Sequence, residues 1–491
     1  MQATSQTQEQ GRQGLLPNAL GVAGDWVASL ACSGPTTGVA YTLGALLVLS
    51  GLASPLVILV SGIAILLVAM GYSRLNSWRA NAGAPYVWVG AVISPVVGFS
   101  LGIMALMIGF LVNIGNITLA GSYLLGIINP GATFPKIVIW LVSAAYMAVI
   151  IYIAVRGIRP SVRVQAAILG GEYTIVIAFA IASLFYESSH HHLGASTPSW
   201  SYFSPHSSAA GFSGLAAAAV IGGFLFGGWE APFMVSEESR KPNFNPGRAA
   251  ILGVLSALIW YLFLFVVFQG IASTGAVITH SADVLGYAGT LVAPDPLARL
   301  LPLAVFSALF AATQMQLVEA SRVMFSMGRD RLLPTKLGET SPRFRTPWLA
   351  ALVLGTLPPI LLIPYLWSSG ASKVIIDIIG SVGLLYLVMY TVIPLACAWF
   401  ARATWRQGGR DRLVGVIAPL IGGLFMGVLF VYGLKTLPAA ASIVAGIVLG
   451  VCLAWAIVAK LASGNPYFRQ QRIHLQADEL ATAASVPEEA S

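Results

Sequence analysis

A carboxylate stands beside helix-breaking residues in the segment GFLFGGWEAPFMVSEESRKP, residues 223–242. The segment begins as an apolar run, and Gly227, Gly228 and Pro232 then flank Glu230. Glycine lets the backbone leave helical geometry at low steric cost, whereas proline removes an amide donor. Carbonyl groups released by such a break can accept hydrogen bonds from an ammonium group, and a nearby carboxylate can hold a proton or a cation. The segment is therefore a candidate binding and coupling site.

A second interruption of this kind lies near the start of the chain, in DWVASLACSGPTTGVAYTLGALL at residues 25–47. Ser33, Gly34 and Pro35 fall in the middle of that apolar run. Backbone groups freed at membrane depth are tolerated where they are buried in protein or line a wet cavity. The two breaks therefore predict a substrate site between them. The alternative is that both are kinks or close-packing points of ordinary membrane helices.

The composition indicates whether these breaks are surrounded by water or by lipid. Of 491 residues, 57% are hydrophobic and 9% are charged, and the mean hydropathy is +0.82. A soluble domain carries about a quarter charged residues. No charged residue occurs between Asp25 and Arg74 or between Arg79 and Lys136. Because the apolar stretches are long and unbroken rather than alternating, they disfavour a β-barrel. We predict an all-α polytopic membrane protein.

Splitting the apolar stretches at charged and Gly/Pro-rich positions predicts twelve spans. The approximate bounds are 20–49, 53–75, 92–126, 135–155, 163–187, 211–237, 247–273, 296–327, 347–367, 374–401, 413–433 and 438–461. The breaks then lie five spans apart, which predicts two inverted repeats with a substrate site between them. The expected organisation is an N-terminal tail (1–19), a twelve-helix domain (20–461) with repeats at 20–187 and 211–401 and two further helices at 413–461, and a C-terminal tail (462–491).

The distribution of Lys and Arg predicts the orientation. Cytoplasmic loops retain positive charge, and the loops after even-numbered spans carry the basic clusters at 74–79, 156–163, 240–248, 329–345 and 402–412. Of the 26 basic residues, Lys136, Arg299, Lys373 and Lys435 fall on the other side. We expect both tails in the cytoplasm, a location in the cytoplasmic membrane, and lipid as the surrounding partner. The same asymmetry explains the net charge of +8 without a nucleic-acid partner.

Residues that commonly bind metals or catalyse reactions are placed unfavourably for either role. Cys32, Cys397 and Cys452 fall within spans, and His190–His192 fall in an outer loop that we expect to be solvated. We therefore expect no metal site and no cofactor. An enzyme would need clustered His, Asp or Ser on facing helices, and a sensor would be expected to carry a larger output domain than the tail after Lys460. Both classes remain alternatives to a transporter.

Four motifs, in their order along the predicted topology, resemble the amino acid–polyamine–organocation (APC) transporters. They are GYSRLNSWRANAGAPYVWVGAVISPVVGFSLG at 71–102, VRGIRPSVRVQ at 155–165, FGGWEAPFMVSEESRKPNFNPGRA at 226–249 and SRVMFSMGRDRLLP at 321–334. The resemblance covers nearly the whole chain. It implies a LeuT-type fold with a 5+5 inverted repeat and two additional helices. It also implies alternating access, with amino acids, polyamines or related amines as cargo.

The resemblance also implies where a substrate binds. The first break would bind a substrate carboxylate, helped by the positive end of the following half-helix, and carbonyls of the second would accept from the substrate ammonium. Trp229 is a candidate gate or a packing residue, and Asn113 and Asn116 share a helix face that either reaches the cavity or makes interhelical hydrogen bonds. The predicted substrate-binding residues are Cys32, Ser33, Gly34, Thr36, Thr37, Asn113, Asn116, Leu225, Phe226, Gly227, Gly228, Trp229 and Glu230.

Carboxylates at membrane depth are costly and therefore functional candidates. Glu172 and Glu230 are the predicted coupling residues, with Glu230 expected at the N-terminus of an inner half-helix. Glu319 is expected to pair with Arg322, three residues further on. Glu172 occupies a position where several proton-coupled relatives have lysine, so their coupling chemistry does not transfer directly. We predict a secondary active amino acid transporter that is coupled to protons; Na⁺ held by Glu172 and a polyamine cargo are the alternatives.

Overall fold

The computed structural model describes residues 14–190, 194–208, 210–281, 283–364, 371–405 and 408–470. The described residues do not include 1–13 and 471–491 of the predicted tails. They also do not include His191 and His192. Regular secondary structure in the described ranges is helical, apart from one isolated parallel bridge between Leu20 and Ser239. The prediction of an all-α fold is therefore confirmed.

The first predicted break is a single residue wide. Helix α2 (Val22–Ser33) ends where Gly34 adopts a left-handed conformation with φ +51°, and helix α3 (Pro35–Ser50) begins at the next residue. Only glycine adopts this conformation without steric cost. Pro35 occupies the first position of α3, where an amide hydrogen would have no partner within the helix. The sequence Ser-Gly-Pro thus ends one helix and starts another within a single residue.

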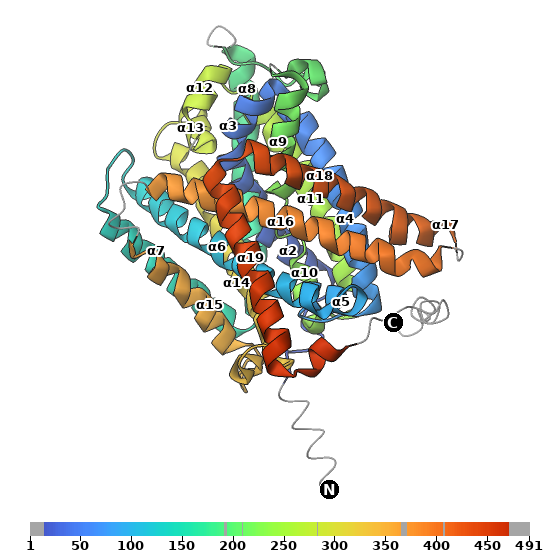
Figure 1. Ribbon diagram of the computed structural model, residues 1–491. Coiled ribbons are helices and arrows are strands. Elements are labelled where there is room, and N and C mark those ends of the chain that lie inside the picture. Colours follow the sequence, from blue (N-terminus) through green and yellow to red (C-terminus); the bar gives the residue numbers. More distant parts are fainter. Residues whose placement is uncertain are drawn as a thin grey trace.

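Long helices complete the first half of the bundle (Figure 1). Helix α6 has 34 residues and α8 has 32, whereas a membrane span needs about 20. A short helix, α5, precedes α6 and ends at the first residue of the predicted third span of 92–126. The elements are α4 (Ser54–Trp78), α5 (Pro85–Val92), α6 (Pro95–Ile128), α7 (Lys136–Arg156) and α8 (Ile158–Ser189).

The second break is wider than the first. Helix α9 (Gly211–Leu225) is followed by five non-helical residues, and α10 (Ala231–Met234) is one turn long before a 3₁₀ turn at Ser236–Glu238. The break predicted within the span at 211–237 is present, but the inner half-helix expected after Glu230 is only one turn long. Glycines at 227 and 228 and Pro232 prevent the helix from continuing.

The remaining helices form the second half and its additions. By length and composition, nine helical stretches in the described ranges can cross a membrane, with 22–78 counted as one, and α9 and α15 are shorter apolar helices. The chain is a multi-pass membrane protein. The elements are α11 (Asn245–Phe268), α12 (Thr274–Thr279), α13 (Val284–Val292), α14 (Leu300–Arg329), α15 (Trp348–Leu361), α16 (Ala371–Ala401), α17 (Gly409–Asp411), a π-helical segment (Arg412–Ile417), α18 (Ala418–Thr436) and α19 (Ala439–Ser463).

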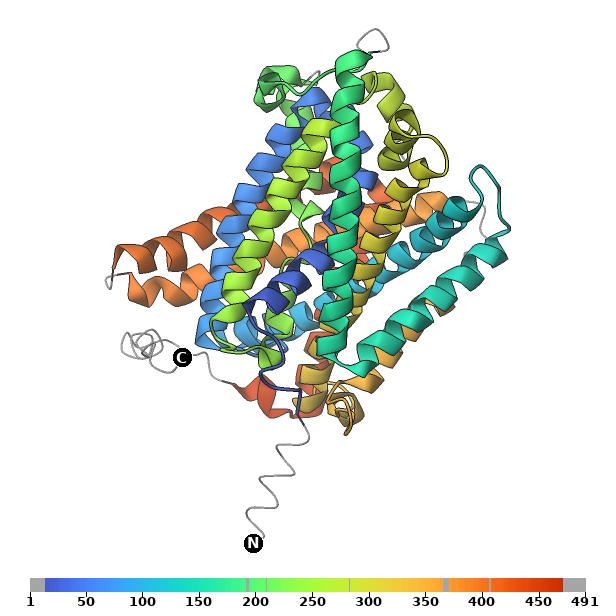
Figure 2. The ribbon, with the colours of Figure 1, turned by 180° about the vertical axis from the view of Figure 1, so that it is seen from behind.

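The two interrupted helices are packed among the long helices. Helix α2 packs against α11, α14 and α10, and α9 packs against α3, α4, α16 and α18. Helix α7 lies beside α15 at one side of the bundle (Figure 1), and α16 lies beside α18, as both views show (Figures 1 and 2). We call the end of the bundle that contains Leu15 and Tyr467 the terminal end. The opposite, distal end carries α12, α13 and the 194–208 segment.

Candidate functional site

The two breaks touch each other through their backbones. Gly228 has φ +98°, and a Cβ added there would lie 2.6 Å from the Cys32 carbonyl oxygen. The Ser29 hydroxyl donates to the Trp229 carbonyl at 2.9 Å, which joins α2 to the same segment. Gly228 is therefore required for close approach of one broken helix to the other, because any side chain would separate them.

A cavity of about 180 Å³ adjoins this contact. It lies between the breaks and side chains of α6, α14 and α16. Seven of the predicted binding residues line it, namely Cys32, Ser33, Gly34, Thr37, Asn116, Leu225 and Gly227. The other lining residues are Gly38, Tyr41, Thr42, Leu111, Val112, Gly115, Leu119, Phe224, Ala312, Gln316, Val382 and Tyr386.

The N-terminus of α3 forms one polar pole of the cavity. Pro35 has no amide hydrogen, so the first amide donors of this helix come from Thr36 and Thr37. The Thr37 hydroxyl is buried, lacks a hydrogen-bond partner and belongs to a residue that lines the cavity. The positive end of a helix macrodipole, unpaired amides and a free hydroxyl together favour a carboxylate.

The carbonyl ends of α2 and α9 form the opposite pole. The Leu225 carbonyl accepts from the Tyr261 hydroxyl at 2.8 Å, and the Phe226 carbonyl accepts from the Trp229 amide at 3.4 Å. The Phe226 carbonyl also accepts from the Ser33 hydroxyl at 3.5 Å, so both of its lone pairs are used, whereas the Leu225 carbonyl can accept a second hydrogen bond. The negative ends of two helix dipoles converge here, which favours an ammonium group.

Six predicted binding residues do not line the cavity: Thr36, Asn113, Phe226, Gly228, Trp229 and Glu230. The Thr36 hydroxyl accepts from the Trp260 indole at 3.2 Å, and Asn113 is 1% exposed. Trp229 is fully buried in an aromatic cluster, with ring centroids 5.0 Å from Tyr72, 5.9 Å from Tyr390 and 6.1 Å from Phe233. In this conformation Trp229 packs behind the cavity.

Glu230 is held by two neutral donors. Its Oε2 accepts from the Gly228 amide at 3.1 Å and from the Tyr390 hydroxyl at 2.8 Å, and the residue is 2% exposed. Although Glu230 caps α10, that helix is one turn long and has little dipole to offer. The expected stabilisation by an inner half-helix is therefore replaced by these two hydrogen bonds.

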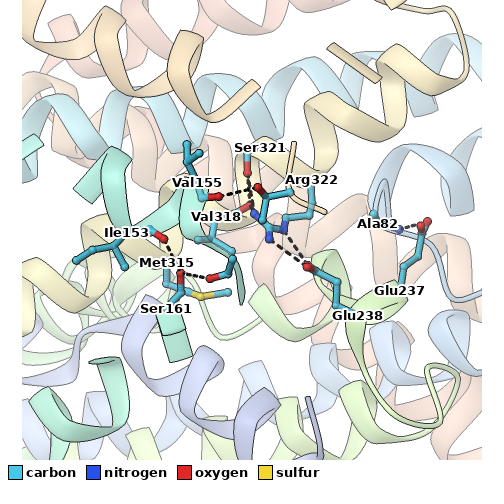
Figure 3. A network of polar contacts seen from close by, with 12 residues as sticks. Ala82, Ile153, Val155, Ser161, Glu237, Glu238, Met315, Val318, Ser321 and Arg322 are labelled. Atoms are coloured by element: carbon cyan, nitrogen blue, oxygen red, sulfur yellow. Dashed lines mark hydrogen bonds and ion pairs between the residues drawn. The ribbon is translucent and has the colours of Figure 1, made fainter. Parts of the chain in front are cut away.

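The expected pairing of Glu319 with Arg322 is wrong. Arg322 donates from Nε to Glu238 Oε2 at 2.9 Å and from Nη2 to Oε1 at 3.2 Å, and both side chains are fully buried (Figure 3). Glu319 lies instead beside Cys32, and its Oε2 has no hydrogen-bond partner. The helix spacing offered a local partner, but the guanidinium faces the segment after α10, where a bidentate carboxylate is available.

Glu172 lies against the outside of the first break. It is 1% exposed, and neither carboxylate oxygen has a partner with hydrogen-bond geometry. The Thr36 hydroxyl is its neighbour, and Tyr173 stacks on Trp260 alongside it at 4.0 Å between ring centroids. Thr36 and Thr37 therefore connect the N-terminus of α3 to Glu172 on one side and to the cavity on the other.

Sequence reasoning missed most of the cavity wall contributed by α6, α14 and α16. Leu111, Val112, Gly115 and Leu119 lie at the three- and four-residue spacings that put them on one helix face with Asn116. That spacing was a usable signal. Gln316 and Tyr386 are polar residues within apolar spans, but their pairing across two helices, with Gln316 Nε2 donating to the Tyr386 hydroxyl at 3.0 Å, had no sequence signal.

A second cavity, of about 860 Å³, opens at the distal end. Its lining includes Tyr123 and Asp283, and the Tyr123 hydroxyl donates to Asp283 Oδ1 at 2.9 Å. Burial raises the pKa of the Asp283 carboxyl, while the Gly286 amide and the Tyr123 hydroxyl oppose that shift. Tyr123 meets Tyr41 edge-to-face at 6.1 Å, and Tyr41 lines the central cavity. An aromatic pair thus separates the two cavities.

The fold resembles that of a solved structure. The crystal structure of MhsT in complex with L-phenylalanine superposes with a TM-score of 0.56 at 17% sequence identity, covering 84% of this chain and 98% of that one. The architecture, with paired broken helices at its centre, is a LeuT-type membrane fold. The amino acid permease family model matches residues 26–457. The chain belongs to the amino acid permease family, within the APC superfamily.

The names of the sequence relatives mention different substrates. The branched-chain amino acid permease BcaP of Bacillus subtilis (strain 168) is 24% identical over 342 residues, which are 66% of this chain and 70% of that protein. The low-affinity putrescine importer PlaP of Escherichia coli (strain K12) is 23% identical over 380 residues, covering 75% and 78%.

Proposed function

We propose that this protein is a secondary active transporter that moves amino acids across the cytoplasmic membrane by alternating access, coupled to protons. The observation that carries the proposal is the pair of opposite backbone poles at two abutting breaks, beside a cavity of about 180 Å³. A carboxylate at the N-terminus of α3 and an ammonium at the carbonyl ends of α2 and α9 complement these poles. The amino acid cargo in the names of several relatives supports the same choice.

The conformation supports access from the distal end. Toward the terminal end, the Leu20 amide donates to the Glu238 carbonyl at 3.0 Å, and the Arg240 amide donates to the Leu20 carbonyl at 2.7 Å. The buried Arg322–Glu238 pair lies in the same layer. Opening the central cavity toward the terminal end requires these contacts to separate. Toward the distal end, the Tyr41–Tyr123 pair lies between the central cavity and the second cavity.

Glu172 supplies a physical route for proton coupling. An ionised Glu172 and a substrate carboxylate would place two negative charges at the N-terminus of α3. Like charges at short distance disfavour each other, so substrate binding favours a protonated Glu172. Under this proposal, a carboxylate substrate binds more tightly as the pH falls. Glu230 is the second coupling candidate, because its two donors leave it without a fixed countercharge.

Two alternatives have specific support. Glu230 and Glu319 both lie behind Cys32, and two carboxylates near the ammonium pole would favour a polyamine; the relationship to PlaP agrees. Sodium bound at Glu172 is the alternative to a proton, because neither oxygen of this buried carboxylate meets hydrogen-bond geometry with any described residue, although the Thr36 hydroxyl lies beside it.

Uptake into proteoliposomes tests the proposal directly. We expect accumulation of a labelled amino acid driven by a proton gradient, independent of sodium and abolished by a protonophore. Accumulation driven by sodium alone would replace the proton with sodium. Uptake of putrescine without any amino acid would replace the cargo.

We further propose twelve spans with both termini in the cytoplasm. The basic residues Arg156, Arg159 and Arg163 lie at the α7–α8 turn and support this orientation. This turn is near the terminal end, because the Thr346 hydroxyl donates to the Val155 carbonyl and the adjacent Arg345 donates to the Leu15 carbonyl. Single cysteines introduced at 156–163 should react with a membrane-impermeant maleimide only after the membrane is permeabilised. Labelling of intact cells at these positions would reverse the orientation.

A further inference from the structure

The lining of the central cavity limits which substrate side chains can be accepted. The two backbone poles set no such limit, because they bind only the carboxylate and ammonium groups. Among the residues whose side chains the structure describes, those that line the cavity include no Asp, Glu, Lys, Arg or His. Two of the polar ones are already committed: Gln316 bridges Cys32 and Tyr386, and the Thr42 hydroxyl donates to the Gly38 carbonyl at 2.7 Å. Leu111, Val112, Leu119, Phe224 and Val382 supply apolar walls.

A charged substrate side chain would find no countercharge on this wall. Glu230 and Glu319 lie on the other side of Gly228 and Cys32, at the ammonium pole, where a zwitterion already places its positive charge. Taking a further charge out of water without a partner is strongly unfavourable. The lining therefore discriminates against lysine, glutamate and diamines by desolvation, while an apolar side chain gains from burial.

The size limit is set at one position on α6. Gly115 lines the cavity, and a Cβ added there meets nothing within 4 Å, so the open space lies directly against it. The other lining glycines are obstructed: an added Cβ would lie 2.7 Å from the Tyr261 hydroxyl at Gly38 and 2.8 Å from the Tyr386 ring at Gly227. Gly34 is constrained by its positive φ. A side chain at position 115 therefore reduces the cavity without displacing its walls.

We infer that the site selects zwitterionic amino acids with an uncharged, chiefly apolar side chain, and that Gly115 determines the largest side chain accepted. The inference rests on the proposed transport of amino acids and narrows it to one substrate class. The cavity, at about 180 Å³, is slightly larger than the roughly 150 Å³ engineered cavity that admits benzene. That space accommodates an aliphatic side chain such as that of leucine.

The test compares uptake of alanine, leucine, lysine, glutamate and putrescine by the purified protein in proteoliposomes. We expect leucine and alanine to enter at least tenfold faster than the three charged compounds. Gly115→Val should lower the leucine-to-alanine uptake ratio at least tenfold, because lost space penalises the larger side chain. The matched control is Gly170→Val on α8, where a Cβ also meets nothing within 4 Å but the residue is exposed; its ratio should not change.

Equal uptake of lysine or putrescine and leucine would overturn the inference, and so would an unchanged ratio in Gly115→Val. A thermal-shift measurement in detergent separates this inference from the proposed function. Leucine that raises the Tm of the wild type but not of Gly115→Val, without being accumulated by vesicles, would support the inferred selectivity and contradict transport. Neither a thermal shift nor uptake with leucine would overturn both.

Discussion

Two buried carboxylates, one at the end of the second break and one after it, lie only eight positions apart, yet their surroundings differ. Glu238 is fully buried against Arg322, which donates two hydrogen bonds to it. Glu230 is equally buried but accepts from a backbone amide and a tyrosine hydroxyl, both neutral. A guanidinium partner keeps a buried carboxylate ionised, and the two groups form a fixed ion pair. A carboxylate whose donors are neutral can be present either as the protonated acid or as the anion. The first suits a closing contact, and the second suits a group that changes charge during a cycle.

The largest expected effect comes from breaking the fixed pair. Arg322→Met leaves Glu238 buried without its partner, which should cost about 3–5 kcal/mol. We expect little folded protein, or a large fall in Tm measured by fluorescence-detected size exclusion. Arg322→Met combined with Glu238→Gln removes both charges and should recover most of the loss. An unchanged Tm in the single variant would show that the pair is dispensable.

The next effect comes from separating the two breaks. A side chain at Gly228 meets the Cys32 backbone at 2.6 Å and must adopt a positive φ. Strain and overpacking of this kind cost about 1–3 kcal/mol. Gly228→Val should weaken substrate binding at least tenfold, as measured by equilibrium binding in detergent. Gly170→Val serves as the control, and wild-type affinity in Gly228→Val would mean that the breaks need not touch.

A smaller effect on binding, but a specific one on coupling, is expected at Glu230. Glu230→Gln keeps the shape and can still accept from Gly228 and Tyr390 through its amide oxygen. We expect binding within about threefold of wild type, together with reduced dependence of accumulation on the pH gradient, because the titratable group is gone. Glu172→Gln measured in parallel identifies which carboxylate carries the effect. If Glu230→Gln retains the full pH dependence, Glu172 is the better candidate.

The smallest effect on stability is expected at a second ion pair, Arg329–Glu237, which is partly exposed to solvent. Arg329 donates to Glu237 at 2.8 Å, but the two side chains are 38% and 23% exposed. Solvent-exposed pairs contribute about 0–1 kcal/mol. Arg329→Gln should therefore lower Tm only slightly, and less so at high salt. A loss as large as that of Arg322→Met would show that burial does not distinguish the two pairs.

Helices and their interruptions could be predicted because they depend on local chemistry. Long apolar runs must form helices in lipid, since no water is present to satisfy the backbone. Gly34 with Pro35, and Gly228 near Pro232, mark breaks because these residues alter the backbone itself. The length of the inner half of the sixth span was mispredicted. The apolar residues continue through 231–234, but only one helical turn forms there. Apolar character alone does not specify helical continuity.

The partners of the buried charges depended on tertiary structure. Arg322 stands three residues from Glu319, and helix spacing favours that pair, yet the guanidinium binds Glu238 from another segment. Glu230, a predicted substrate contact, and Trp229, predicted as a gate or a packing residue, both lie behind the cavity wall, among Tyr390 and its aromatic neighbours. Side-chain direction at an irregular break is set by packing, which local sequence does not specify.

A polytopic helical membrane protein with two broken helices could be predicted from the residues alone, because hydrophobicity and backbone breakers act locally. Three relations could be found only in the folded structure: Gly228 abuts Cys32, Glu172 shares the N-terminus of α3 with the cavity, and Gly115 faces open space. These relations join residues from separate helices. They depend on how the helices pack, and packing is a property of all the side chains together.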